Sequence, residues 1–361
     1  MKIDANSDNH NSLVIFNLST DVDNIALSFA NDWIEEFSKR YIKVRVWSVH
    51  VGSYDLPPNV KVTELGGGSL LKRFLILIKT FSILFYLMKN PKSHVFYHMN
   101  APMAALIGAF LRAFKIPQIL WYSHAHASFA LKIALKWVDK IVSTSPNSFP
   151  LLTKKLISTG HGVRDRNVNR LIQDIPTYAI SFLGRISPVK RLEILIDEVA
   201  IFQNSKDFHL KVYLIGPCEG ARDERYKSEL VARAKSKDVQ VIFVAPVRHE
   251  NVQFELLKYD LAYNGTLQSL DKGAIESVFS KCILISDQKS TLMECGYSGF
   301  SLDNLGEALK ISEQLSLIVS LSRTEITDLI ESAKNETLSR HSLSSTIDKI
   351  FIEFAKVKSC K

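Results

Sequence analysis

Cysteine is scarce in this sequence, and so are glycine and proline. Only four of the 361 residues are cysteine (Cys218, Cys282, Cys295 and Cys360), and none has Cys-x-x-Cys spacing. We therefore expect neither a disulfide-held secreted domain nor a zinc ribbon, and we expect reduced thiols and a cytoplasmic protein. The 15 glycines and 11 prolines show no period, while 46% of the residues are apolar. Collagen-like and disordered chains are excluded.

A long apolar run is also missing. The longest, FLILIKTFSILFYLM, has 15 residues and is broken by Lys79, whereas a membrane-spanning helix needs about 20. The chain opens with the polar stretch MKIDANSDNHNS, which lacks the apolar core of a signal peptide. We expect neither a transmembrane helix nor a targeting segment.

Acidic residues are absent between Leu65 and Val138. Nine basic residues lie in this stretch: Lys72, Arg73, Lys79, Lys89, Lys92, Arg112, Lys115, Lys132 and Lys136. Residues 1–172 carry a net charge of +10 and residues 173–361 one of −2. The basic residues stand among leucine, isoleucine and phenylalanine, which favours an anionic membrane surface over nucleic acid as partner. A buried helix with solvated basic flanks is the alternative.

Predicted strands and helices alternate in two runs. The first run has strands at 12–18, 44–49, 94–98, 118–123 and 140–145, and helices at 25–39, 69–88, 102–114 and 128–137. The second has strands at 179–184, 210–216, 239–245, 260–265 and 282–287, helices at 192–202, 225–234, 251–257 and from 274, and a helical tail over 305–358. This alternation predicts α/β domains with parallel sheets covered on both faces.

The polar segment 164–177 separates the two runs. We therefore expect two doubly wound domains, 1–172 and 173–340, followed by a C-terminal helix at 341–361 that packs back toward the first domain. Ligands of such sheets bind beyond the carboxyl ends of the strands, so a cleft between the domains is expected to hold them.

Two loops after predicted strands carry the informative charges. The first holds Gly184, Arg185 and Lys190. The forked guanidinium of an arginine and the point charge of a lysine can together bind a diphosphate. The alternative is that these basic side chains are simply solvated. The second, Asn264 to Gly273, opens a helix whose N–H groups suit phosphates. Glu276 follows in the first turn and suits the hydroxyls of a ribose, with compensation of the helix dipole as the plainer interpretation.

Four histidines follow strand ends in the first half, namely His98, His124, His126 and His161. We expect them to face the same cleft, together with Asn100. The His-Ala-His pair has no carboxylate nearby in sequence, so no metal site is expected there.

Several segments resemble the family-four retaining glycosyltransferases, whose GT-B fold has two Rossmann-like, doubly wound domains facing across a cleft. GRISPVKRLEILIDEVA is similar to that family's Gly-Arg…Lys segment. QSLDKGAIESVFSKCILIS is similar to its donor-binding Glu-x7-Glu segment, with Gln268 in place of the first Glu and Glu276 as the second. HMNAPMAAL, LWYSHAHAS and TGHGV resemble a bacterial and archaeal subgroup with a Ser-Leu-Asp-Lys loop.

The resemblance implies roles for individual residues. Arg185 and Lys190 would stabilise the departing diphosphate, Glu276 would hold the ribose, and His124 would lie near the transferred sugar. The other donor-binding positions it implies are Gly184, Gln268, Ser269, Leu270, Asp271, Lys272 and Gly273. Acceptor-side positions are Asp21, Asp23, His98, Asn100, His126 and His161.

Asp21-Val22-Asp23 matches a motif that binds a metal and a diphosphate in the other glycosyltransferase fold. That motif follows a complete nucleotide-binding sheet, whereas this one follows the first predicted strand. We therefore expect no metal, and either carboxylate could meet an acceptor hydroxyl instead.

The predicted function is metal-independent, retaining transfer of a hexosyl-type sugar from a nucleotide-diphosphate donor, with UDP favoured over GDP. The expected acceptor is a glycan or lipid-linked saccharide in surface polysaccharide synthesis, at the inner face of the plasma membrane. No cofactor and no nucleic acid are expected. The alternative is a degenerate GT-B protein that binds without turnover, as Gln268 suggests. An epimerase lacks its acid–base carboxylates here, and a dehydrogenase lacks GxGxxG after the first strand.

Overall fold

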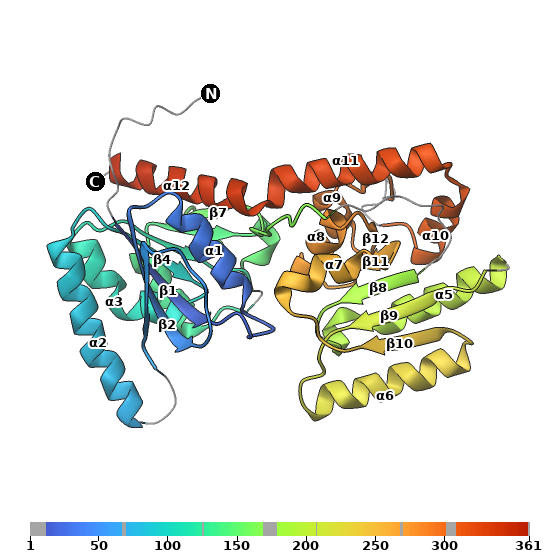
Figure 1. Cartoon of the computed structure of the whole chain (residues 1–361), viewed down its shortest axis with the longest axis horizontal. Coiled ribbons are helices and arrows are strands. Elements are labelled where there is room, and N and C mark those ends of the chain that lie inside the picture. The colour runs from blue at the N-terminus through green and yellow to red at the C-terminus, as the bar shows by residue number, and fades with distance from the viewer. Residues whose placement is uncertain are drawn as a thin grey trace. The chain divides into compact units, whose positions relative to one another are not determined.

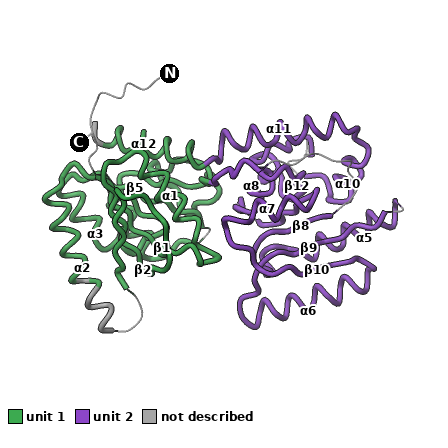
Figure 2. Tube along the Cα trace, in the orientation of Figure 1, with its two compact units in different colours: residues 1–162, 343–361 green, residues 163–342 purple. Residues whose placement is uncertain are grey.

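The computed structural model describes residues 12–66, 70–124, 126–168, 179–206, 208–267, 270–300 and 308–359. The chain divides into two compact units (Figure 2). Unit 1 comprises residues 1–162 and 343–361, and unit 2 comprises residues 163–342. The chain enters unit 2 at Val163, so the boundary precedes the segment 164–177 that composition suggested as a linker.

Unit 1 is built on a seven-stranded parallel sheet in the order β3-β2-β1-β4-β5-β6-β7 (Figure 1). Its strands are β1 (Ser12–Thr20), β2 (Lys43–Val51), β3 (Val60–Glu64), β4 (His94–His98), β5 (Gln118–Trp121), β6 (Lys140–Ser143) and β7 (Leu156–Ser158). Its helices are α1 (Phe29–Ser38), α2 (Leu70–Lys89), α3 (Ala101–Ala113), α4 (Phe129–Trp137) and α12 (Leu343–Ser359).

Strand β1 shows why this sheet is covered on both faces. Leu13 and Ile15 pack into one core together with residues of α1 and α12. Val14 and Phe16 pack into the opposite core with residues of α2, α3 and α4. Because side chains alternate along a strand, a run that is apolar throughout must be buried on both sides.

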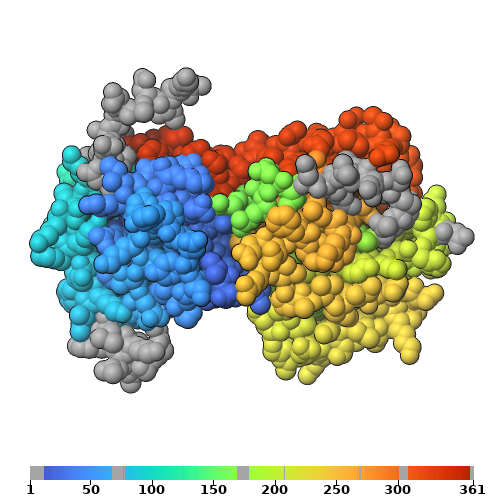
Figure 3. All heavy atoms as spheres, in the orientation of Figure 1, coloured from blue at the N-terminus to red at the C-terminus, as the bar shows by residue number. Residues whose placement is uncertain are grey.

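Helix α12 belongs to unit 1 although it lies at the end of the sequence. Phe354 stacks on His94 of β4 with ring centroids 4.4 Å apart, and Asp348 pairs with Arg40 just after α1 at 2.7 Å. The space-filling view shows α12 in red against the blue N-terminal segments (Figure 3). The C-terminal helix is therefore part of the core of unit 1.

Unit 2 holds a five-stranded parallel sheet in the order β10-β9-β8-β11-β12. Its strands are β8 (Ala179–Leu183), β9 (Lys211–Ile215), β10 (Gln240–Val244), β11 (Leu261–Tyr263) and β12 (Ile283–Ile285). Its α-helices are α5 (Leu192–Ser205), α6 (Ala221–Ser236), α7 (Val252–Leu256), α8 (Lys272–Phe279), α9 (Lys289–Glu294), α10 (Ile311–Ser320) and α11 (Arg323–His341). The sheet order reverses between β8 and β11.

The prediction of two doubly wound α/β sheets is confirmed. Sequence patterns missed β3, β7 and α9, and the first helix begins at Phe29 rather than at residue 25. Among the described residues, no helix is long and apolar enough to cross a membrane.

Candidate functional site

The carboxyl ends of β8 and β11 mark the switch point of the unit 2 sheet, where the strand order reverses. Ligands of open α/β sheets bind at this point, because the loops after the two strands turn to opposite sides and leave a crevice. The loop after β8 contains Arg185 and Lys190, and the loop after β11 leads into α8. Both charged loops predicted from the sequence therefore meet at the position that the topology favours.

Lys190 lies at the centre of a polar cluster formed by these loops. Its Nζ is 2.7 Å from Oδ2 of Asp271 and 3.3 Å from Oγ1 of Thr266. The same Asp271 oxygen accepts hydrogen bonds from Thr266 Oγ1 (2.5 Å) and Asn264 Nδ2 (3.1 Å). The lysine is thus held in one position, with a carboxylate as its counter-ion.

Asp271 occupies the N-cap position of α8 but does not cap the helix with its side chain. An aspartate at this position usually accepts hydrogen bonds from the first-turn N–H groups. Here its carboxylate points to Lys190 instead, so the first turn of α8 has no side-chain cap. These N–H groups and the positive end of the helix dipole suit an anion.

Two glycines allow the loops to pack this closely. A Cβ atom on Gly273 would lie 2.6 Å from the carbonyl oxygen of Leu183, and one on Gly216 would lie 2.0 Å from that of Gly184. Both distances are shorter than real contacts, so any side chain would push the loops apart. Leu270, by contrast, is buried in the core of unit 2.

Arg185 is the exposed cation of the site. Its Nη1 donates to Glu219 Oε2 at 3.1 Å, and its Nε lies 3.7 Å from Asp223 Oδ2. Almost half of the arginine side chain is exposed to solvent, so its contacts with these carboxylates are weak and exchangeable.

Glu276 is buried in a cluster of three charged or titratable side chains. Its Oε1 lies 3.1 Å from Lys272 Nζ and 3.3 Å from His249 Nδ1, and the latter two atoms are 3.0 Å apart. Burial alone would raise the pKa of Glu276, but Lys272 and His249 outweigh burial and lower it. The carboxylate is therefore charged and held in place by both partners.

Glu276→Gln tests this charge through the pH dependence of stability. The folded-state pKa lies below the ordinary 4.5, so the charged carboxylate stabilises the fold above that pH and loses its effect as the pH falls through the lower folded value. The difference in unfolding free energy between wild type and the variant should shrink below about pH 4.5. Denaturant titrations from pH 7 to 3 measure it, and a constant difference would contradict the assignment.

The predicted acceptor-side residues His98 and Asn100 have structural contacts in unit 1. His98 is surrounded by Trp33 and Trp121, with ring centroids 4.9 and 5.0 Å away, and burial lowers its pKa to about 3. Asn100 caps α3 by accepting from the Met103 N–H at 3.1 Å. The cap accounts for Asn100 without an acceptor, whereas Nε2 of His98 is buried and has no hydrogen-bond partner among the described groups. The acceptor-side assignment of both residues stays a prediction.

The other predicted histidines, His124, His126 and His161, differ in exposure. His124 and His126 are exposed, with His124 in edge contact with Tyr122 and the His126 carbonyl accepting from the Tyr122 hydroxyl at 2.7 Å. The His161 ring lies 6.3 Å from that of Trp121. Within the described residues, no three His, Cys, Asp or Glu side chains are grouped so that they could hold a metal ion.

Asp21 shapes the loop after β1, at the switch point of unit 1. Its Oδ1 accepts from the Asp23 N–H at 3.0 Å, and its Oδ2 lies 3.7 Å from His50 Nε2. Asp23 itself is exposed. Gln268 and Ser269, which the resemblance assigned to the donor, lie outside the described residues.

Sequence reasoning predicted Asp271 and Lys272, but it missed the other partners in these clusters, Thr266, Asn264 and His249. Thr266 and Asn264 stand directly after a strand, which was the available signal for them. His249 belongs to the segment after β10, and no sequence pattern connects it with Glu276. A cavity of about 370 Å³ also lies beside the site, lined by Ile186, Pro217, Phe243 and Pro246 among others.

Solved structures share this fold over nearly the whole chain, and it is the GT-B fold of glycosyltransferases. HepE of Anabaena, solved with UDP and glucose, is 14% identical with a TM-score of 0.69, covering 96% of this chain and 100% of its own. A glycosyltransferase of Rickettsia africae is 12% identical with a TM-score of 0.70, covering 96% and 98%. Sucrose-phosphate synthase of Thermosynechococcus elongatus is 12% identical with a TM-score of 0.71, covering 97% and 100%. No family model and no curated protein matches the sequence.

Proposed function

We propose that the chain is a glycosyltransferase that uses a nucleotide-diphosphate sugar as donor. The observation that carries the proposal lies in unit 2: the loop after β8, which holds Arg185 and Lys190, meets the uncapped start of α8 at the switch point of the sheet, where Lys190 lies 2.7 Å from Asp271. Two cations and a helix N-terminus are the groups that a diphosphate requires. The neighbour solved with UDP and glucose supports the same class of ligand.

The proposed chemistry is electrostatic. As the bond between the anomeric carbon and the phosphate oxygen breaks, negative charge develops on the leaving diphosphate, where Arg185, Lys190 and α8 stabilise it. The acceptor hydroxyl oxygen forms the new bond on the same face of the sugar, and its proton passes to the departing phosphate oxygen. No enzymic nucleophile and no metal take part in this retaining scheme.

The ribose and the base of the donor are assigned to groups beside the proposed diphosphate site. Glu276 holds the ribose hydroxyls, and the cavity lined by Ile186 and Phe243 takes the base, with UDP favoured over GDP. Its volume of about 370 Å³ falls within the range of small-molecule pockets. The transferred sugar is of the hexosyl type and lies near His124. The acceptor is a glycan or a lipid-linked saccharide.

The proposed setting is surface polysaccharide synthesis at the inner face of the plasma membrane. The acid-free, basic and apolar stretch of unit 1 supports it, because a lipid-linked saccharide and its leaflet are both anionic.

A second candidate, binding without turnover, is favoured by one observation: Arg185 and Lys190 each already face a carboxylate.

A thermal-shift panel of nucleotide sugars, followed by a transfer assay with the stabilising donor, tests the proposal. A donor at a hundred times its dissociation constant should add about 2.7 kcal/mol to the stability. Stabilisation by nucleotide sugars without release of the nucleoside diphosphate would favour the second candidate. A panel in which no nucleotide sugar stabilises the chain would refute both.

Asp271→Asn should tighten the binding of UDP. The carboxylate pairs with Lys190 at 2.7 Å and would repel the incoming diphosphate, whereas an amide keeps a hydrogen-bond acceptor for Thr266. We expect the Kd for UDP to fall by about threefold to tenfold at low salt, measured by calorimetry. Asp197→Asn, which breaks a pair with Arg233 on α5 and α6, is the matched control. Weaker binding in Asp271→Asn would mean that the carboxylate chiefly positions the lysine.

A further inference from the structure

Helix α2 exposes large apolar side chains along one side. Ile78, Phe81, Phe85 and Met88 are exposed to 52, 73, 59 and 49% of their surface. Their spacing places them on one face of a helix. The opposite face supplies Ile83 and Leu87 to the core of unit 1. The helix is therefore apolar on both its inner and its outer side, whereas a surface helix normally has a polar outer face.

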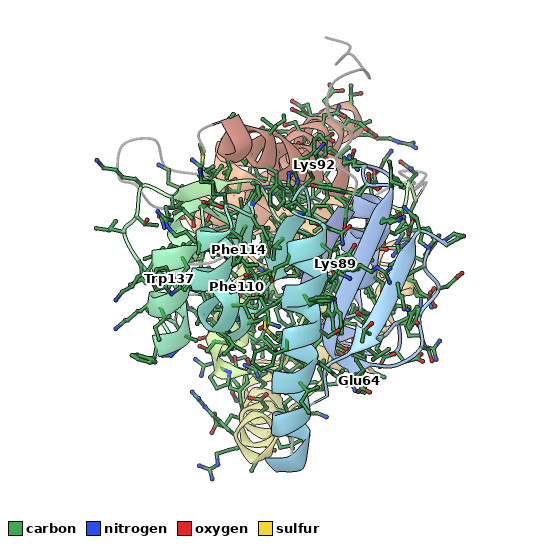
Figure 4. The ribbon with its side chains drawn as sticks, turned by 90° about the vertical axis from the view of Figure 1, so that its left-hand side faces the viewer. Glu64, Lys89, Lys92, Phe110, Phe114 and Trp137 are labelled. Atoms are coloured by element: carbon green, nitrogen blue, oxygen red, sulfur yellow. The ribbon has the colours of Figure 1, made fainter. Side chains whose placement is uncertain are left out.

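Helix α3 continues this apolar surface. Leu106 and Phe114 are exposed to 51 and 48%, and the rings of Phe110 and Phe114 lie 4.5 Å apart. Figure 4 looks onto this side of unit 1, with α2, α3 and α4 in front of the sheet and Phe110, Phe114 and Lys89 all on the near side. We call these exposed apolar residues the α2–α3 face; they are Ile78, Phe81, Phe85, Met88, Leu106 and Phe114.

Exposed cations lie on the same three helices and the turns that follow them. Lys89 and Lys92 lie at the end of α2, Arg112 and Lys115 lie at the end of α3, and Lys132 and Lys136 lie on α4, which packs against α3. None of the six makes an ion pair with a described carboxylate. The nitrogen of Lys89 lies 4.3 Å from the centre of the Phe85 ring. Basic side chains on the same helices as exposed apolar ones, with no acidic residue from Leu65 to Val138, match the headgroups and acyl boundary of an anionic bilayer.

The structure changes which cations carry this attraction. Lys79, counted among the sequence-predicted contacts, donates to the carbonyl oxygens of Glu64 (2.6 Å) and Leu65 (3.3 Å). It tethers α2 to the end of β3 and is not free to meet a headgroup. The side chains of Lys72 and Arg73 lie outside the described part of the chain. Lys89 and Lys92 are therefore the cations of α2 and its following turn that the structure offers.

We propose that the α2–α3 face docks on an anionic lipid bilayer, with Phe81, Phe85 and Phe114 entering the interface and the lysines of these helices and turns meeting the headgroups. A second copy of the chain fits the face less well, because a two-fold contact would bring the like charges of the two copies together. Nucleic acid would satisfy the cations but would leave the apolar side chains in water. The proposal rests on the proposed function only for the choice of the cytoplasmic leaflet.

Co-sedimentation of the full chain with vesicles tests the docking without donor or acceptor. Wild type should bind phosphatidylcholine vesicles that contain phosphatidylglycerol, and should bind pure phosphatidylcholine much less. The double variant Phe81→Ser/Phe85→Ser should bind at least about tenfold more weakly, and Lys89→Gln/Lys92→Gln should lose part of the salt dependence. Phe254→Ser is the matched control, since this phenylalanine of α7 is exposed to 54% in unit 2.

Three results would overturn the proposal. One is equal binding of wild type and Phe81→Ser/Phe85→Ser. Another is equal binding to neutral and anionic vesicles. The third is that wild type fails to bind vesicles and instead forms a dimer without lipid, as seen by light scattering, whereas Phe81→Ser/Phe85→Ser is a monomer. Calorimetry with UDP in the absence of vesicles reports separately on the proposed transfer function. A failure of the docking proposal can therefore be distinguished from a failure of the proposed function.

Discussion

Lys190→Ala should lower sugar transfer by at least about a hundredfold while the chain remains folded. In the proposed reaction the lysine stands where the diphosphate charge develops, and one such contact is worth about 3 to 4 kcal/mol in a transition state. Folding should survive because Asp271, its partner, keeps hydrogen bonds from Thr266 and Asn264. Arg185→Ala should act in the same direction, since its guanidinium is the second cation of the site.

The control is a lysine in an ordinary ion pair. Lys237, at the end of α6, lies 3.4 Å from Asp197, and Lys237→Ala should leave transfer unchanged. Initial rates with a saturating donor, alongside thermal melts of each variant, separate lost chemistry from lost structure. Near-normal rates in both Lys190→Ala and Arg185→Ala would remove these residues from the mechanism.

Most of the fold follows from patterns that the sequence displays openly. Strands buried on both faces, such as β1 and β4, are short apolar runs, and helices with one buried face show helical spacing. The elements missed lie where this signal is weak. Strand β3 is a half-exposed edge strand and β7 has only three residues, so neither needs an apolar run.

The site was less predictable because contacts decide the role of a polar residue. The loops after β8 and β11 could be located, since charged residues follow strand ends there. His98 also follows a strand end, yet Trp33 of α1 and Trp121 of β5 enclose it. Nothing in its local sequence separates it from the exposed His124. The pairing of Lys190 with Asp271, which joins two distant loops, is likewise a product of the tertiary fold.

Glu276→Ala should weaken the binding of UDP by about a hundredfold, because a carboxylate that accepts two ribose hydroxyls makes charge-assisted hydrogen bonds. The loss should be similar with the bare nucleoside diphosphate and with the intact donor. Gln268→Ala, by contrast, should matter only when the sugar is attached. Calorimetry with UDP and with the donor sugar nucleotide distinguishes these two roles.

Removal of Glu276 also leaves Lys272 and His249 close together without their shared carboxylate, which would destabilise unit 2 on its own. The double variant Glu276→Ala/His249→Ala removes one of the two basic groups left behind, and it should recover stability without recovering UDP affinity. If affinity returns with stability, Glu276 acts only by holding the start of α8 in place. If Glu276→Ala binds UDP as tightly as wild type, the ribose assignment is wrong. If the single and the double variant both lose UDP binding, and the double variant melts like wild type, the result would support a direct contact between the carboxylate and the ribose.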